Sequence, residues 1–247
     1  KMLFRFQTSK PSYFISPVGQ IKGVIYFFSS EMSPFVKSYL FAYNFLQASA
    51  WTISLLSILN KTVNVAYSSA GYLISVMQTA SFLEVLHGAI GIVPSGFLSP
   101  LMQWSGRTHF ILAIVGQIKE VQESPWLSIT LVAWCIGEMI RYPHYALTCL
   151  GTCPYWLTYL RYTGFIMIYP TGLMGELLIM YKALPLVKER NLYANFFSVF
   201  PFTYYDFLWA VLLVYPFLWM KLYLQLFKQR KSKLGKADKH HGKRKRR

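Results

Sequence analysis

Residues Leu160–Leu178 read L-R-Y-T-G-F-I-M-I-Y-P-T-G-L-M-G-E-L-L, an apolar run that contains Arg161, Tyr162, Tyr169 and Glu176. Side chains seven residues apart return to nearly the same face of a helix, with an offset of about 20°. The spacing predicts a helix on which Tyr162, Tyr169 and Glu176 form one polar stripe. A carboxylate at the centre of a membrane helix costs about 2.5–3.5 kcal/mol. Glu176 therefore either holds helices together or has a function, and function is the default interpretation inside a membrane.

The composition of the chain indicates a membrane protein. The 247 residues are 54% hydrophobic and 14% charged, whereas a soluble domain has about 25% charged residues. The formal net charge of +16 does not indicate nucleic-acid binding, because twelve of the 25 basic residues lie between Lys221 and Arg247. The positive charge therefore belongs to a tail and not to a folded surface.

Six apolar segments each have about the 20 residues that a bilayer crossing needs. They are Tyr39–Leu59, Val65–Leu86, Ile92–Val115, Trp126–Leu150, Tyr155–Tyr181 and Phe202–Phe227. We therefore predict an all-α polytopic membrane protein, a six-transmembrane-helix bundle with residues 182–201 as a connection. An even number of spans places both termini on one side, and the basic tail makes that side cytoplasmic. The predicted parts are a loosely ordered leader (1–36), a six-span domain (37–228) and a basic cytosolic tail (229–247).

The cysteines do not indicate a metal site or a disulfide framework. Cys135, Cys149 and Cys153 are odd in number and have no C-x-x-C spacing. Free cysteines are commonly small buried hydrophobic residues. We expect no metal and no cofactor.

Other ionisable residues in the apolar segments occur in pairs. Glu138 and Arg141 are three residues apart and can pair on one helix face. A supporting role is favoured over a catalytic one, because pairing is the cheapest way to keep charge in a membrane. Glu84 and His87 lie one turn apart, and a bond between them near a helix end is favoured over a proton relay because water is close there.

Tyr169 and Glu176 are suited to proton transfer. Two helical turns separate them by about 10.5 Å along the axis, which leaves room for a small polar group of a substrate. Gly172 and Gly175 thin the helix between them. A desolvated carboxylate suits general-base work near neutral pH, and a tyrosine hydroxyl can donate to a leaving oxygen. The spacing predicts proton-transfer chemistry but does not name the reaction.

Five blocks between Tyr39 and Lys231 carry a resemblance to a known family. They are Y-L-x-x-Y-N-x-x-Q-x-x-x-W at Tyr39–Trp51, L-E-x-x-H-x-x-x-G at Leu83–Gly91, Q-x-x-S/G-R at Gln103–Arg107, I-R-Y at Ile140–Tyr142 and L-R-Y-T-x-F-x-x-x-Y-P-x-G-x-x-x-E at Leu160–Glu176. In this order they resemble the very-long-chain (3R)-3-hydroxyacyl-CoA dehydratases, also known as protein tyrosine phosphatase-like or PASTICCINO 2-like membrane proteins. The sequence departs from the family at Pro143-His144, where a more aromatic pair is usual.

The resemblance implies a reaction and its residues. In that family the tyrosine of Y-P-x-G and the glutamate seven residues later are catalytic, which implies Tyr169 and Glu176. The reaction removes water from a 3-hydroxyacyl-CoA to give a trans-2-enoyl-CoA, the third step of fatty acid elongation in the endoplasmic reticulum. The implied partners are acyl-CoA, membrane lipid, a condensing enzyme, a 3-ketoacyl-CoA reductase and an enoyl-CoA reductase. The candidate supporting or substrate-binding residues are Arg107, Arg161, Gly172, Tyr162, Glu84, His87, Glu138 and Arg141.

The expected mechanism has three parts. Glu176 removes the proton from C2, Tyr169 protonates the departing C3 hydroxyl, and Arg161 or Arg107 biases the local field. An exchange of roles between Tyr169 and Glu176 remains open. With cytoplasmic termini the fifth span starts on the cytosolic side, so Arg161 lies where a CoA phosphate would arrive and Glu176 lies deeper.

The tail gives an expected localisation. Lys243–Arg247 fits K-x-K-x-x at the carboxyl end, a retrieval signal of the endoplasmic reticulum that works from the cytosol. The alternative is a basic patch held on anionic lipid, worth about 1 kcal/mol per charge near the surface.

Three rival functions are weaker. A membrane scaffold has no need of both Tyr169 and Glu176. A transporter with a proton path through Glu84, Glu138 and Glu176 is disfavoured, because no internal repeat is visible. A phosphatase needs a thiolate nucleophile, and no cysteine lies near 87–94.

Overall fold

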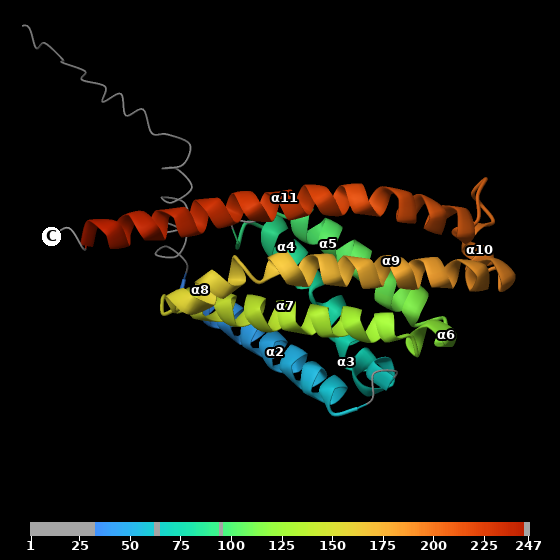
Figure 1. The fold of residues 1–247 in the computed structure, drawn as a ribbon, viewed down its shortest axis with the longest axis horizontal. Coiled ribbons are helices and arrows are strands. Elements are labelled where there is room, and N and C mark those ends of the chain that lie inside the picture. The colour runs from blue at the N-terminus through green and yellow to red at the C-terminus, as the bar shows by residue number, and fades with distance from the viewer. Residues whose placement is uncertain (1–32, 62–64, 94–95, 245–247) are drawn as a thin grey trace, which may run out of the picture.

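The computed structural model describes residues 33–61, 65–93 and 96–244, with side chains up to residue 234 (Figure 1). All regular structure in these ranges is helical, which confirms the all-α prediction. The longest helices described are α2 (Pro34–Leu59), α7 (Pro125–Cys149), α9 (Phe165–Glu189) and α11 (Tyr204–Arg244). The shorter ones are α3 (Ala66–Ala80), α4 (Phe82–Ala89), α5 (Leu98–Thr108), the π-helix η2 (His109–Val115), α6 (Lys119–Gln122), α8 (Tyr155–Arg161) and α10 (Ala194–Phe197).

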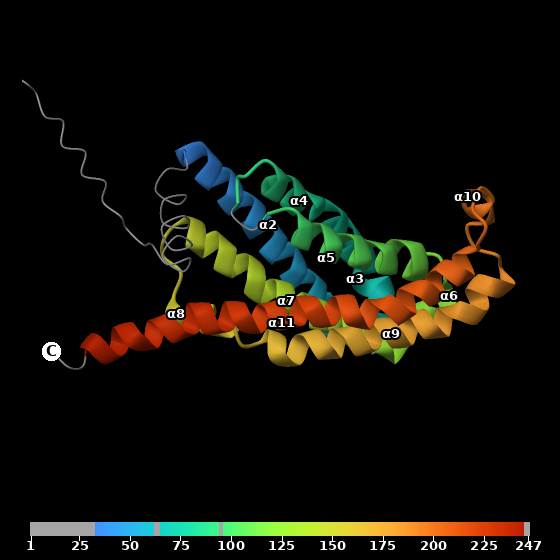
Figure 2. The same cartoon turned by 90° about the horizontal axis from the view of Figure 1, so that it is seen from above.

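The long helices pack in the order α11, α9, α7 and α2 (Figure 1). The helices α3, α4 and α5 lie across from α9 and α11, so that α5 and α11 face each other over the middle of the molecule (Figure 2). The buried core lies where α2, α3, η2, α7 and α9 meet. Its largest side chains include Trp51, Ile74, Phe110, Tyr142 and Ile179.

Local sequence sets the start of α2 and both ends of α7. The Ser33 side chain accepts a hydrogen bond from the Val36 amide at 3.3 Å, and Pro34 occupies the first turn of α2. Serine before a helix and proline in its first turn are both favoured there. The α7 helix also starts with a serine followed by a proline, Ser124 and Pro125, although the Ser124 side chain makes no capping hydrogen bond. It ends before Gly151, whose φ of +71° suits glycine.

The predicted segments agree with the helices in part. The fourth, Trp126–Leu150, agrees with α7 to within one residue at each end. The second is divided into α3 and α4 at Ser81. The third starts only at Leu98 and ends in a π-helix. The first begins five residues early, inside the predicted leader, of which residues 1–32 lie outside the described part of the chain.

The fifth segment differs most from its prediction. A turn at residues 162–164 separates α8 from α9, because Thr163 and Gly164 are weak helix formers. Tyr162 ends α8 and does not share a continuous helix with Tyr169 and Glu176, so the single stripe predicted for all three was wrong. The connection predicted from residue 182 was also wrong, since α9 continues to Glu189.

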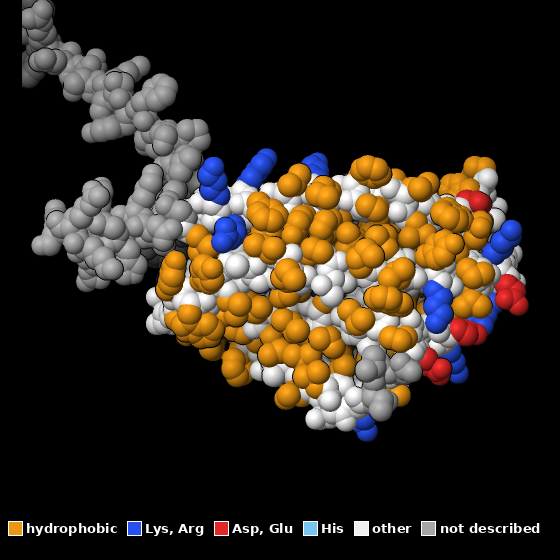
Figure 3. All heavy atoms as spheres, in the orientation of Figure 1, with side chains coloured by type: hydrophobic (Ala, Val, Ile, Leu, Met, Phe, Trp, Pro, Cys, Tyr) orange, Lys and Arg blue, Asp and Glu red, His pale blue; other side chains and the backbone are white. Residues whose placement is uncertain are grey.

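Two stretches are long and apolar enough to cross a membrane, Tyr155–Glu189 and Tyr204–Leu234. Apolar side chains cover the middle of the face seen in Figure 3, whereas charged side chains gather toward its two ends. On α11, Leu213 is 65% and Phe217 is 77% exposed. An exposed apolar surface of this extent fits contact with lipid. The described part of the chain therefore has two candidate membrane spans.

Candidate active site

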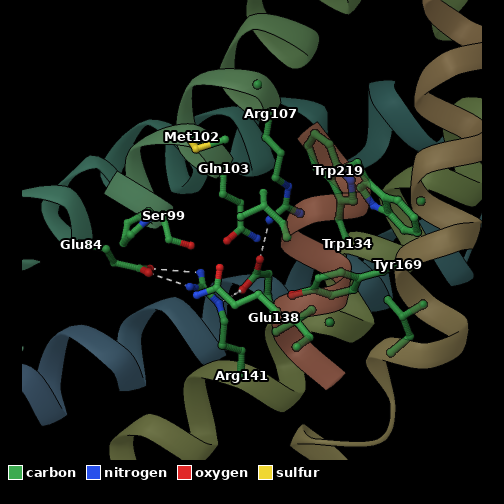
Figure 4. Close-up of a pocket in the computed structure, with 18 of the residues that line it drawn as sticks. Glu84, Ser99, Met102, Gln103, Arg107, Trp134, Glu138, Arg141, Tyr169 and Trp219 are labelled. Atoms are coloured by element: carbon green, nitrogen blue, oxygen red, sulfur yellow. Dashed lines mark hydrogen bonds and ion pairs between the residues drawn. The ribbon is translucent and has the colours of Figure 1, made fainter. Parts of the chain in front are cut away.

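A cavity of about 1420 Å³ is lined by residues of α2, α4, α5, η2, α7, α9 and α11 (Figure 4). The structure brings all ten predicted site residues to its walls: Glu84, His87, Arg107, Glu138, Arg141, Arg161, Tyr162, Tyr169, Gly172 and Glu176. They come from α4, α5, α7, α9 and the end of α8, so the fold gathers residues that are far apart in the sequence.

Glu176 is buried and held at both carboxylate oxygens. Oε1 accepts a hydrogen bond from Nε1 of Trp134 on α7 at 2.7 Å. Oε2 accepts one from the hydroxyl of Tyr215 on α11. The indole N–H can only donate, so Oε1 is the acceptor in this hydrogen bond. Glu176 therefore has a fixed orientation at the cavity wall.

Tyr169 lies two turns before Glu176 on α9. Its ring packs edge-on against Phe165, with the centroids 6.0 Å apart, and projects into the cavity toward Glu138 (Figure 4). Within the described residues its hydroxyl has no hydrogen-bond partner, and it is not bonded to Glu176. The hydroxyl is therefore available to a molecule in the cavity.

A chain of four charged side chains lines the wall opposite Tyr169 (Figure 4). Glu138 accepts from Nη1 of Arg107 and from Nε of Arg141, both at 2.5 Å. Arg141 also donates to Glu84 at 2.6 Å. The predicted pair of Glu138 and Arg141 is confirmed, within a larger network of two positive and two negative charges.

The bond predicted between Glu84 and His87 was wrong. Glu84 accepts instead from Arg141 and from the hydroxyl of Tyr142 at 2.6 Å. Hydrogen bonds from a charged donor are about twice as strong as neutral ones. His87 bonds with the hydroxyl of Tyr39 at 2.9 Å. Glu84 is thus turned toward α7, and His87 toward α2.

Arg107 and Glu176 both contact the side chain of Trp134. Its Cζ lies 4.0 Å from the centroid of the Trp134 ring, and the same indole donates to Glu176. A guanidinium over a tryptophan face is attracted to the ring electrons. The contact therefore fixes the indole that orients the carboxylate and brings positive charge close to Glu176.

Arg161 and Gly172 complete the predicted set. Nη2 of Arg161 donates to the Tyr145 hydroxyl at 3.3 Å, at the cavity end near α8. A Cβ on Gly172 would lie 3.8 Å from Trp134, which is ordinary contact, whereas a Cβ on Gly175 would lie 2.0 Å from Oγ1 of Thr130. Gly172 therefore leaves space in the cavity, and Gly175 allows α9 and α7 to approach closely.

The sequence did not single out Trp134 and Tyr215 as site residues. Trp134 lies one turn before Glu138, so it belongs to the same polar face of α7 and could have been found by that spacing. Tyr215 is one of 18 tyrosines, and no spacing within its own helix connects it to Glu176. The two residues meet only because α11 packs against α9.

The chain is similar to known proteins over most of its length. The family model described as "Protein tyrosine phosphatase-like protein, PTPLA" matches residues 78–236. Human very-long-chain (3R)-3-hydroxyacyl-CoA dehydratase 2 is 35% identical over 84% of this chain and 85% of its own. Arabidopsis thaliana very-long-chain (3R)-3-hydroxyacyl-CoA dehydratase PASTICCINO 2 is 30% identical over 71% of this chain and 82% of its own. No solved structure matches. The chain therefore belongs to the protein tyrosine phosphatase-like family, PTPLA.

Proposed function

We propose that the chain dehydrates very-long-chain (3R)-3-hydroxyacyl-CoA to trans-2-enoyl-CoA, the reaction for which its relatives are named. One observation carries the proposal: Glu176 is held at both oxygens beside a cavity into which Tyr169 projects its hydroxyl. This arrangement provides a proton acceptor and a proton donor along one helix. Elimination of water needs both, one at C2 and one at the oxygen on C3.

The proposed steps follow from these roles. Glu176 takes the proton from C2, and the electrons of the C2–H bond form the C2=C3 double bond. The C3–O bond breaks, and Tyr169 supplies the proton with which the hydroxyl leaves as water. A proton then returns from Glu176 to Tyr169 before the next turnover. The two donors on Glu176 support it as the base, because they hold its carboxylate in one orientation at the cavity wall.

The charged network supports this chemistry from the opposite wall. The network has no net charge, because two arginines, Arg107 and Arg141, pair with two glutamates, Glu84 and Glu138. Pairing lowers the cost of keeping these four charged side chains inside the protein. We propose that Arg107 favours the enolate-like charge that develops at the thioester. Its place over the Trp134 ring puts it near Glu176.

The membrane arrangement is part of the proposal. We infer six spans with both termini cytoplasmic, in the endoplasmic reticulum, and a tail signal at Lys243–Arg247. The two candidate spans and the exposed apolar middle of the molecule support a membrane location. In this function the chain works after a 3-ketoacyl-CoA reductase and before an enoyl-CoA reductase, in a cycle that a condensing enzyme begins.

Dehydration in reconstituted membranes tests the catalytic pair. Tyr169→Phe and Glu176→Gln remove one proton-transfer group each, and we expect each to lower kcat by at least 100-fold, within the range of general acid–base catalysis. Tyr159→Phe and Glu189→Gln make the same changes at exposed positions outside the cavity and should leave kcat unchanged. Near-normal dehydration by both site variants would overturn the assignment. A wild-type chain that folds but dehydrates no 3-hydroxyacyl-CoA would instead favour a catalytically silent scaffold.

A further inference from the structure

The two ends of the cavity differ in chemistry. Beyond Glu176 the lining residues are mostly apolar, with Phe110, Met180, Phe207 and Val211 among them. The end near α8 and the C-terminal part of α11 is polar and basic, with His144, Arg161, Tyr162, Gln229 and Lys233. A molecule that fills this cavity therefore has an apolar end and an end that prefers positive charge and hydrogen-bond donors.

Arg161 differs from the other arginines of the cavity. Arg107 and Arg141 both pair with Glu138. Arg161 is half-buried, and its described partner is the neutral hydroxyl of Tyr145, 3.3 Å away, with no carboxylate in the described residues within ion-pair distance. A cation taken out of water without an anion is costly. The missing anion points to a negatively charged ligand.

His144 adds a buried ring nitrogen beside Arg161. The side chain is 8% exposed, and its Nδ1 has no hydrogen-bond partner in the described part of the chain. The ring packs edge-on against Tyr145 and Tyr162, with centroids 5.9 Å away in each case. Unpartnered buried polar atoms are rare in folded proteins. A ligand oxygen at this end of the cavity would satisfy the nitrogen.

Lys233 brings a second positive charge from a different helix, α11. It lies on the face of α11 that lines the cavity, and it acts electrostatically on His144 together with Arg161. Lys233 is about 27 Å further along α11 than Tyr215, the residue that holds Glu176. The basic end is therefore well separated from the proposed reaction centre, and a long arm must connect a ligand's anionic part to its reacting part.

We propose that Arg161, His144 and Lys233 bind the phosphate groups of the coenzyme A part of the substrate. This inference rests on the proposed function. The planar fork of arginine matches phosphate oxygens with paired N–H donors, and lysine acts as a point charge. The pantetheine arm then crosses the middle of the cavity, which places the thioester beside Tyr169 and Glu176 and the acyl chain toward the apolar end.

Two substrates separate phosphate binding from catalysis. The 3-hydroxyacyl-pantetheine thioester has the reacting atoms of the CoA substrate without its phosphates. We expect Lys233→Gln to lower kcat/KM for the CoA substrate relative to the pantetheine substrate by about fivefold, as for the loss of one partly exposed ion pair. His144→Phe should lower the same ratio and keep the edge-on packing. Most of the loss should appear in KM and little in kcat.

The matched control is Lys231→Gln, since Lys231 is exposed two residues earlier and does not line the cavity. In Lys231→Gln, the ratio of kcat/KM for the CoA substrate to kcat/KM for the pantetheine substrate should equal that of the wild type. Adenosine 3′,5′-bisphosphate should also inhibit the wild type competitively against the CoA substrate, and less strongly after Lys233→Gln. A ratio that is unchanged by Lys233→Gln and His144→Phe would overturn the proposal.

The membrane offers the same phosphate chemistry in lipid headgroups, so the assay is run in two vesicle compositions. With phosphatidylcholine alone, the ratio should still fall in Lys233→Gln. If the ratio falls in Lys233→Gln only when phosphatidylserine is added, the residues bind lipid headgroups, and the proposal is overturned. Failure of the proposed function looks different, because the wild type would then dehydrate neither substrate.

Discussion

The hydroxyl of Tyr215 donates a hydrogen bond to Glu176, across the contact between α11 and α9. The other oxygen of Glu176 is held by Trp134 of α7. Three helices thus meet at one carboxylate, and the last helix of the chain supplies one of the two donors that orient it. The proposed base is therefore aligned only when α11 is packed against α9.

Tyr215→Phe removes this hydrogen bond and keeps the ring. A hydrogen bond to a charged group contributes about 1.5–3 kcal/mol, so we expect kcat to fall by about tenfold or more. KM should change little, because the hydroxyl is committed to Glu176. Steady-state dehydration kinetics check this. Tyr205→Phe, on the same helix and outside the cavity, should match the wild type; an equal loss in both variants would contradict a specific role for Tyr215.

Trp134→Phe removes the second donor and keeps an aromatic ring under Arg107. We expect a fall in kcat similar to that of Tyr215→Phe. The double variant leaves the buried carboxylate with neither donor, so its activity should approach that of Glu176→Gln. Because both donors act on one group, the two effects should not be independent. A double variant with simply multiplied effects would indicate that the donors act separately.

The ten residues predicted from the sequence all line one cavity, and the motifs that pointed to them are local. The ten candidate residues lie on apolar segments of helix length, and the α7 segment was placed to within one residue. The partner of Glu176 on α11 could not be predicted in this way. Tyr215 meets Glu176 through packing between separate helices, and no period within either helix records that contact.

The end of α9 is helical although its charged residues resemble those of a loop. Lys182, Lys188 and Glu189 make residues 182–189 appear to be a polar connection. In the structure Ala183, Leu184 and Val187 are buried on one face. The segment forms about the last two turns of the helix, with the apolar spacing typical of one buried face. The three charged residues obscure this apolar spacing in the sequence.

Glu138→Gln should destabilise the protein because Arg107 and Arg141 both depend on this carboxylate. Breaking a buried ion pair from one side costs about 3–5 kcal/mol. Adding Arg107→Gln removes the excess positive charge and leaves Arg141 paired with Glu84, so the double variant should recover part of the loss. Thermal unfolding in detergent measures both. A double variant less stable than Glu138→Gln would contradict this charge balance.

The contact between Glu120 and Arg190 gives a dependence on pH. The Arg190 guanidinium holds the pKa of the Glu120 carboxyl below its usual range, which is about 4.3. A depressed pKa means that the contact stabilises the fold above the ordinary value and loses this effect as pH falls through the lower, folded value. Glu120→Gln should therefore lower the unfolding temperature slightly at pH 7 and not at pH 2.5. Glu123→Gln, at a neighbouring exposed position, should have no effect at pH 7.

Gly172 and Gly175 should respond oppositely to alanine, although one turn of α9 holds both. A Cβ on Gly175 would lie 2.0 Å from Oγ1 of Thr130 and 2.9 Å from the Trp126 carbonyl oxygen, so Gly175→Ala must push α9 from α7. Overpacking of this kind costs about 1–3 kcal/mol, and the unfolding temperature should fall.

Gly172→Ala meets only Trp134, at 3.8 Å, so the fold should be kept. Its methyl group takes space beside Tyr169 and Glu176, and dehydration should slow without loss of stability. If Gly172→Ala has the unfolding temperature and the dehydration activity of the wild type, the substrate does not pass this side of α9.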